Sequence, residues 1–301
     1  MSVQLKYSFK KELAQFTRTF KLLGMILAIF GFAIANPMMY KMTAVLLDQM
    51  DQIDLPTQFG TAAIQTAAPD DTLAGDTPGG MGLGDMAAMY NNASVVFSMS
   101  LVSFATYSLL IIMLVMMKPA GGEQKKRAMI VPLCSGLQYK NYLLPKFVIY
   151  PLAVFALTFL GGLVSGGLCN SLFEVDRVDA GMMAFGSLLM GVYLAFIVSV
   201  YLSLGLCTSR PGLMVGAVFL GQLFLQTLLE SLKLSDYQPF SLVTVVGEMY
   251  TSPDYDLSAK YPSVFTAIGI SIATCVLMYF LAYGVLNLKK VDNQEEVKPA
   301  F

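Results

Sequence analysis

Residues 180–206 read AGMMAFGSLLMGVYLAFIVSVYLSLGL, a stretch without a single charged side chain. A helix of about 20 apolar residues crosses a hydrocarbon core of roughly 30 Å, so this stretch is long enough to span a membrane. Other stretches of the chain meet the same criterion, and none has a charge near its middle. The six predicted spans are Leu22–Tyr40, Ala93–Met117, Leu143–Leu168, Ala180–Leu206, Gly212–Leu234 and Pro262–Leu288.

The composition is that of an integral membrane protein. Of the 301 residues, 56% are hydrophobic and only 13% are charged, and the mean hydropathy is +0.64. These values exclude an ordinary soluble domain. Because the spans use about half of the chain, no remaining segment is long enough for a separate catalytic domain. We therefore predict an all-α membrane protein whose six transmembrane helices occupy residues 22–301.

Basic residues lie mainly on one side of the predicted spans. With a cytoplasmic N-terminus, all but four of the 19 Lys and Arg residues fall on the inner side. The four exceptions are Lys41, Arg177, Lys233 and Lys260. Cytoplasmic segments carry an excess of Lys and Arg, so both termini are predicted to be cytoplasmic. The predicted location is the cell membrane, either a plasma membrane or a bacterial inner membrane.

Residues 1–21 precede the first span and have the pattern of an amphipathic helix. Apolar side chains recur at intervals of three or four residues, at Leu5, Phe9, Leu13, Phe16 and Phe20. The basic side chains fall largely on the other faces, and such a helix typically lies in the headgroup region of a membrane. We predict an interfacial elbow helix that contacts lipid and is anchored by Phe9, Phe16 and Phe20.

Prolines and apolar runs set the expected connections. An outer loop is predicted over 41–92 and a cytoplasmic loop over 118–142. Pro37 predicts a kink or a helix end near the outer end of the first span. Pro211 follows a very short connection and predicts a tight antiparallel hairpin of spans four and five. Leu242–Val246 is too short to span and is predicted to form a helix that lies at the outer interface or dips into it.

The residue types argue against catalysis by this chain. There is no histidine, which removes the commonest general base and metal ligand. The four cysteines are scattered singly, so neither a zinc site nor a disulfide framework is predicted. A membrane-embedded enzyme would need paired carboxylates, a Ser/Lys pair or His ligands, and none is apparent. A channel or secondary transporter commonly has repeats with matching broken helices, and no convincing repeat is visible.

A polar stripe lies within the fifth predicted span. Gln222, Gln226 and Glu230 stand four residues apart, on one face of a helix. Polar groups at membrane depth usually face a bundle interior or a water-filled path. We predict that these side chains line a translocation path. Solvation at the interface is the alternative for Glu230, which lies close to the outer end of the span.

The order of these features resembles that of the permease (transmembrane) subunit of ABC transporters of the second exporter type. An elbow helix, a span, a large outer loop and a second span precede a cytoplasmic loop that contains Glu123. Pro132-Leu133, Tyr139 and Lys146 follow at similar positions, and Pro239 is similar to an outer-loop proline of the family. The Gly-Thr pair that many members carry after the acidic residue is absent, which leaves the subfamily open.

The resemblance implies that the cytoplasmic loop over 118–142 contains a coupling segment that docks on a cytoplasmic ATPase subunit. The alternative is an ordinary cytoplasmic loop, which is basic only because of the side of the membrane on which it lies. The implied docking residues are Glu123, Gln124, Lys125, Lys126, Arg127, Pro132 and Leu133. The chain has no GxxxxGK phosphate loop, so ATP and Mg²⁺ would be bound by that partner and no cofactor by this chain.

Two permeases, as a homodimer or pseudo-dimer, and two ATPase subunits would form the working unit. The fifth span would lie near the interface between the permeases. No nucleic-acid partner is expected. The expected function is ATP-driven export of an amphipathic or hydrophobic substrate such as a peptide, and the chain would not be an enzyme by itself. The alternatives are an ATP-independent channel or secondary transporter, or a membrane-embedded enzyme.

Overall fold

The structure is a computed structural model that describes residues 3–18, 20–52, 89–122, 138–208, 210–232, 237–251 and 257–295. Within these ranges the regular structure is helical, apart from an isolated bridge between Asn92 and Val175. Six of the described helices are long and apolar enough to cross a membrane, which confirms the prediction of a multi-pass helical protein at this level. They are α2 (Phe20–Gln52), α5 (Ala93–Val115), α8 (Tyr139–Leu172), α9 (Ala180–Thr208), α10 (Pro211–Ser231) and α12 (Leu257–Glu295).

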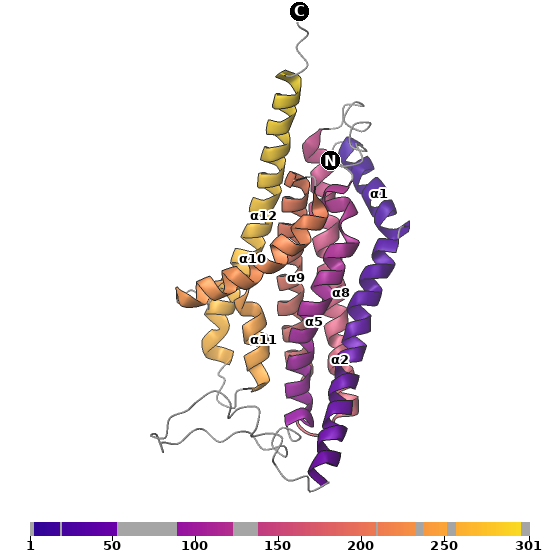
Figure 1. Ribbon diagram of the computed structural model, residues 1–301, viewed down its shortest axis with the longest axis vertical. Helices are drawn as coiled ribbons and strands as arrows, with labels where there is room; N and C mark the ends of the chain where they lie inside the picture. The colour runs from indigo at the N-terminus through magenta and orange to yellow at the C-terminus, as the bar shows by residue number, and fades with distance from the viewer. Residues whose placement is uncertain are drawn as a thin grey trace, which may run out of the picture.

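Three shorter elements accompany these helices. They are α1 (Val3–Arg18), the π-helical turn η2 (Lys118–Gly122) and α11 (Ser241–Thr251). Helix α1 and the C-terminal part of α12 lie at the same end of the bundle, which we call the termini end (Figure 1). The connection from α9 to α10 lies at this end too, and α11 points toward the opposite end (Figure 1).

Helices α5 and α9 form the centre of the bundle, and 61% of the most apolar stretch of each is buried. Helices α2 and α8 pack beside them, and the contact between α8 and α9 is the most extensive. Small residues make this contact close. A Cβ atom on Gly162 would lie 2.7 Å from the Cβ atom of Ser187, so only glycine fits there. In lipid, close packing of this kind replaces the hydrophobic effect as the force between helices.

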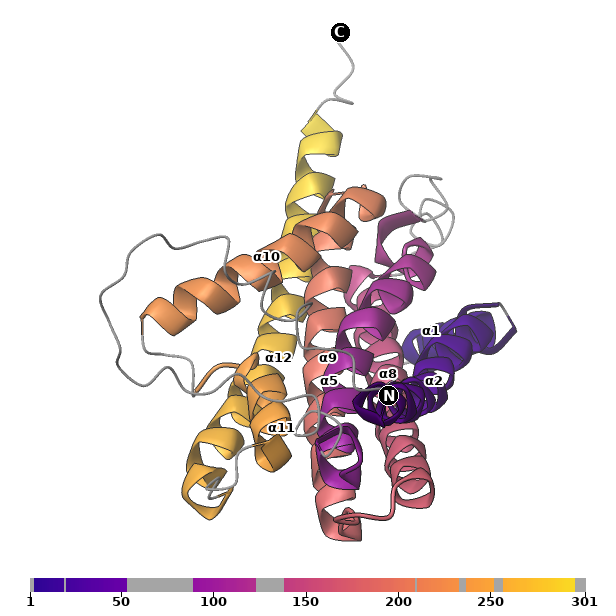
Figure 2. The same cartoon turned by 60° about the horizontal axis from the view of Figure 1, so that its bottom comes forward.

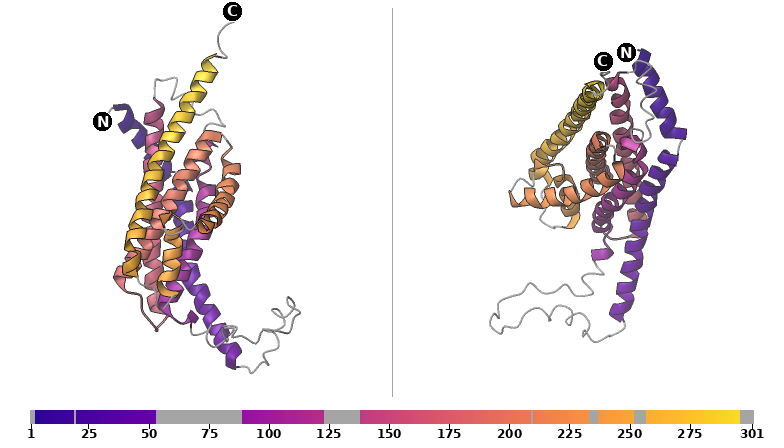
Figure 3. Two further views of the ribbon diagram at one scale, coloured as in Figure 1. Left: turned by 90° about the vertical axis from the view of Figure 1, so that its left-hand side faces the viewer. Right: turned by 45° about the horizontal axis from the view of Figure 1, so that its top comes forward.

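Of the two outcomes predicted at Pro37, a kink or a helix end, the helix end is wrong, because α2 continues to Gln52. A proline removes one intrahelical hydrogen bond, and contacts with α5 on both sides of it compensate. Asn36 donates a hydrogen bond to the carbonyl oxygen of Ser100 (3.2 Å), and the hydroxyls of Tyr40 and Ser103 lie 3.0 Å apart. As a result α2 extends past the neighbouring helices at the opposite end (Figure 3). The first part of the predicted 41–92 loop is therefore helical.

Helix α10 does not pair with α9 as a tight antiparallel hairpin, although the connection between them is short. It leaves the termini end obliquely and leans away from the bundle (Figures 1 and 2). Only 12% of its most apolar stretch is buried. The apolar segment after α10 is confirmed as a helix, α11, which packs against α5, α9 and α12. The bundle therefore has a closely packed side and a loosely packed side.

Candidate functional site

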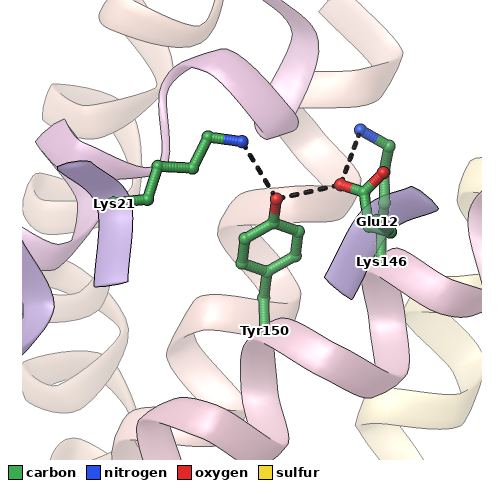
Figure 4. Close-up of polar contacts among 4 residues, drawn as sticks. All are labelled: Glu12, Lys21, Lys146 and Tyr150. Carbon is green, nitrogen blue, oxygen red and sulfur yellow. Dashed lines mark hydrogen bonds and ion pairs between the residues drawn. The ribbon is translucent and has the colours of Figure 1, made fainter. Parts of the chain in front are cut away.

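Four polar side chains from α1, α2 and α8 are buried together at the termini end (Figure 4). The Lys146 ammonium lies 3.4 Å from Oε1 of Glu12. The Tyr150 hydroxyl donates a hydrogen bond to the same oxygen at 2.9 Å and accepts one from Lys21 at 3.1 Å. We call these four residues the Glu12 cluster. It joins the N-terminal helix to two of the membrane-spanning helices.

The local sequence places these side chains. Ser8, Glu12 and Phe16 lie four residues apart and form the face that α1 turns toward the bundle. The Phe16 ring packs edge-on against Tyr150, with ring centroids 5.5 Å apart. At the start of α8, Asn141 donates a hydrogen bond to the side chain of Gln4 (3.1 Å). The contact between α1 and α8 therefore combines an apolar part with a polar part.

Burial decides what this cluster can do. Lys146 and Tyr150 are 0% exposed and Glu12 is 5% exposed, so each charge is removed from water. An unpaired ion in such a place costs several kcal/mol, and pairing with hydrogen bonds offsets that cost. Because the groups come from three helices, the pairing fixes the angle at which α1 meets the bundle. The cluster is a joint between helices, placed at the end of the bundle and not at mid-depth.

The predicted coupling segment lies outside the described residues. This applies to Glu123, Gln124, Lys125, Lys126, Arg127, Pro132 and Leu133. The residues that flank it are described: η2 ends at Gly122 and packs against α9, and α8 begins at Tyr139. Because α8 carries Lys146 two turns later, the segment leads directly into the Glu12 cluster.

The three predicted membrane anchors have different surroundings. Phe16 is buried against Tyr150, Phe9 is half-buried and Phe20 is 85% exposed. Phe16 therefore holds α1 to the bundle. Membrane anchoring by Phe9 and Phe20 stays a prediction.

The structure describes the surroundings of two members of the predicted polar stripe, Gln222 and Gln226. Gln222 points toward α9, where its side-chain NH₂ group donates a hydrogen bond to the Tyr193 hydroxyl. Gln226 is half-buried on the next turn of α10, and Glu230 lies near the end of that helix. The pairing with Tyr193 places Gln222 on the side of α10 that faces the bundle. Whether the stripe lines a path stays a prediction.

Sequence reasoning missed the Glu12 cluster because its charged residues were interpreted only as interruptions of an apolar run, as cytoplasmic basic residues or, for Lys146, as a position of the family motif. A usable signal was present. Glu12 lies between Phe9 and Phe16 at helical spacing, and Lys146 lies between Leu143 and Tyr150 in the same way. A charged residue at an apolar position of a helix predicts a buried partner of opposite charge. Gln238, which is 8% exposed, was also missed and carried no comparable signal.

Of the described cysteines, Cys169 is buried and both Cys207 and Cys275 are half-buried. Among the described residues, no three His, Cys, Asp or Glu side chains gather as metal ligands would. No protein-family model matches the chain, and neither do the curated proteins or the solved structures with which it was compared. The resemblance to exporter permeases therefore rests on the order and spacing of its sequence motifs.

Proposed function

We propose that this chain is the permease subunit of an ABC exporter of the second type, which moves an amphipathic or hydrophobic peptide out of the cell. The main support is the Glu12 cluster. It fixes the N-terminal helix to α8 at the end of the bundle where the connection between η2 and α8 begins and ends. A cytoplasmic ATPase that docks on this connection would act on α1, α2 and α8 together.

Each partner has a distinct role in this proposal. Two ATPase subunits bind ATP and Mg²⁺ in the cytoplasm and close upon each other. The segment from Glu123 to Leu133 receives that movement and passes it to α8. Because the Lys146 ammonium is paired with Glu12, the movement also reaches α1, which rests on the cytoplasmic leaflet. The path between two permeases then opens outward.

A second permease copy is placed against α10. This helix is the least buried of the candidate spans. Leu213, Leu220 and Phe224 are each more than 60% exposed and lie on one face of the helix. A homodimer would cover this face, and the translocation path would run beside it, near Gln222, Gln226 and Glu230.

The test is co-purification with an ATPase subunit, followed by transport and ATP hydrolysis in reconstituted vesicles. Glu123→Lys combined with Arg127→Glu should reduce coupled transport at least tenfold, because two of the four charges of the docking segment, Glu123 and Arg127, are reversed. Arg177→Glu, on the predicted outer face, is the matched control and should leave transport unchanged. Export is disproved if no ATPase subunit binds, or if the double variant transports normally.

A second test concerns the path itself. Gln222→Leu and Glu230→Leu should weaken the stimulation of ATP hydrolysis by cargo in the assembled complex. Unchanged stimulation in both variants would remove these residues from the path.

One observation favours a secondary transporter as the alternative. Helices α10 and α11 together form an interrupted element, and broken helices are frequent in such transporters. A matching break in the first half of the chain is not found among the described residues, since α2 and α5 are continuous. Transport driven by an ion gradient without any ATPase would decide for this alternative.

A further inference from the structure

An open groove runs along the face of α1 that is turned away from the Glu12 cluster. Its volume is about 510 Å³, which lies in the range of ligand-binding pockets. Helix α1 lies at the edge of the bundle, so this face points outward (Figure 2). The described side chains that line the groove share one face of the helix, and the charged ones among them are all basic. They are Tyr7, Lys10, Lys11, Ala14, Gln15 and Arg18.

Burial of Glu12 makes the outside of α1 cationic. Of the charged side chains in this helix, Glu12 alone is acidic. It is 5% exposed and paired with Lys146 on the side of the bundle. The basic side chains of the helix are all exposed, and they are Lys6, Lys10, Lys11 and Arg18. The charge that α1 presents outside the bundle is therefore only positive.

Exposed apolar side chains adjoin this basic face. Phe20, the first residue of α2, is 85% exposed, and Leu13 of α1 is exposed as well. Leu23 and Leu27 continue from Phe20 along one exposed face of α2. Because α2 is long and apolar enough to cross a membrane, acyl chains would contact this face. The headgroups of the same lipids then lie beside the residues just before α2, which include Arg18.

The chemistry of the groove favours a lipid with a negatively charged headgroup. Ammonium and guanidinium groups form strong hydrogen bonds with phosphate oxygens. Basic residues on an amphipathic helix next to a membrane span strengthen binding to anionic lipid by about fivefold each. An acidic protein surface would match the charges but not the apolar side chains of Leu13 and Phe20, which lead directly into the span. An anionic phospholipid matches both.

We infer that the outward face of α1 is a binding site for anionic phospholipid, in which Lys10, Lys11 and Arg18 pair with headgroup phosphates and Phe20 contacts acyl chains. The bound lipid belongs to the leaflet at the termini end. It holds α1 from the outside, as the Glu12 cluster holds it from the inside. Such a site goes beyond the proposed export function and does not depend on it, since it needs only this chain and a membrane.

The test uses the absence of tryptophan from the chain. Phe20→Trp introduces a single fluorescent reporter beside the site. The full chain is placed in mixed vesicles in which either phosphatidylglycerol or phosphatidylcholine carries brominated acyl chains, which quench tryptophan on contact. The association constant at this reporter should favour phosphatidylglycerol at least about fivefold, and salt should lower this preference. Ile272→Trp, at an exposed position in the middle of α12, should show no preference.

Charge variants in the Phe20→Trp background identify the groups responsible. Lys10→Gln, Lys11→Gln and Arg18→Gln combined should reduce the preference to less than about twofold. Exchanging Lys for Arg and Arg for Lys at the same positions keeps the charges and should keep the preference. The matched control removes an equal charge from exposed basic residues elsewhere near the termini end and should also keep it. It combines Lys118→Gln, Lys140→Gln and Arg210→Gln.

Three results would overturn the inference. The first is equal quenching by both lipids at Phe20→Trp, and the second is a preference that persists when the three groove charges are removed. The third is an equal loss in the control variant, which would show only the general attraction between a basic surface and an anionic membrane. Thermal unfolding checks that each variant is folded, and it should change little because the substituted side chains are exposed. If the groove variant keeps its lipid preference and instead loses an ATPase subunit, the face belongs to that partner and the lipid site is wrong.

Discussion

The Glu12 cluster and the α10–α11 break are both polar regions of an apolar bundle, and they differ in how far their groups are paired. In the cluster, Oε1 of Glu12 receives both the Lys146 ammonium and the Tyr150 hydroxyl. In contrast, the side-chain oxygens of Gln222 in α10 and of Gln238 just before α11 are buried without a partner. The cluster belongs to the closely packed side of the molecule, and the break to the loosely packed side.

This difference separates a region held together by paired charges from a region that keeps unpaired hydrogen-bond acceptors. Paired charges hold helices in one arrangement, because any movement would expose a buried ion. Unpaired acceptors gain free energy when a ligand arrives, since the protein itself leaves them unsatisfied. The closely packed side thus suits transmission of movement, and the loosely packed side suits contact with cargo and with a second copy of the chain.

Removing one charge from the cluster should have the largest effect. We expect Lys146→Met to lower the free energy of unfolding by about 3 kcal/mol, because the Glu12 carboxylate stays buried without its ammonium. The measurement is SDS-induced unfolding in mixed micelles. Lys140→Met changes an exposed lysine of the same helix and should cost less than about 0.5 kcal/mol.

A second variant tests the cause. Glu12→Leu combined with Lys146→Met removes both charges and should recover most of the lost stability, since an apolar pair can replace a buried ion pair. Equal effects of Lys146→Met and Lys140→Met would show that the cluster is not a joint.

A larger side chain in the contact between α8 and α9 should lower the free energy of unfolding by less than Lys146→Met does. Gly162→Ala should cost about 1 to 3 kcal/mol, because the added Cβ meets the Cβ of Ser187 at 2.7 Å. Gly167→Ala lies on the same helix with nothing within 4 Å of the added atom, and it should be neutral or slightly stabilising. The same unfolding assay compares them. Similar costs for both variants would contradict the close packing described for this side.

Removing the unpaired acceptor of Gln238 should raise the free energy of unfolding, whereas Lys146→Met and Gly162→Ala lower it. We expect Gln238→Met to raise the unfolding free energy of the ligand-free protein by about 1 kcal/mol, because a buried oxygen without a partner is deleted. Gln49→Met, at an exposed position of α2, should change it by less than about 0.5 kcal/mol. A clear loss of stability in Gln238→Met would mean that the side chain is already paired in the folded protein.

The exposed face of α10 should contribute least to protomer stability. Phe224→Ala should change the unfolding free energy by less than about 0.5 kcal/mol, since the ring is 71% exposed. Phe97→Ala removes a ring that is 0% exposed and should cost about 3 kcal/mol. Cross-linking in membranes should show weaker self-association for Phe224→Ala. Unchanged cross-linking would place the second copy elsewhere.

Hydropathy identified the membrane-spanning helices within a few residues in most cases, because length and apolar content are local properties of the chain. The helix end that was one of the two outcomes predicted at Pro37 is wrong, since contacts with the Ser100 carbonyl oxygen and the Ser103 hydroxyl of α5 accompany a continuous α2. The predicted tight hairpin of α9 and α10 is also wrong. A short connection limits the distance between the end of α9 and the start of α10, but it does not fix the angle at which the two helices cross. The predicted residue Gln222 does contact Tyr193 of α9, whereas the buried residue Gln238 had no signal in the sequence.

The sequence by itself determined that the protein is helical, apolar and able to cross a membrane several times, because these properties depend on neighbouring residues only. The tertiary structure alone decided that Glu12 pairs with Lys146, which lies far along the chain. It also decided that Phe240, just before α11, packs against Tyr193 and Phe196 near the middle of α9, and that the Oε1 atoms of Gln238 and Gln222 are buried without a partner. Pairing and its absence depend on which distant segments pack together, and that is a property of the folded bundle.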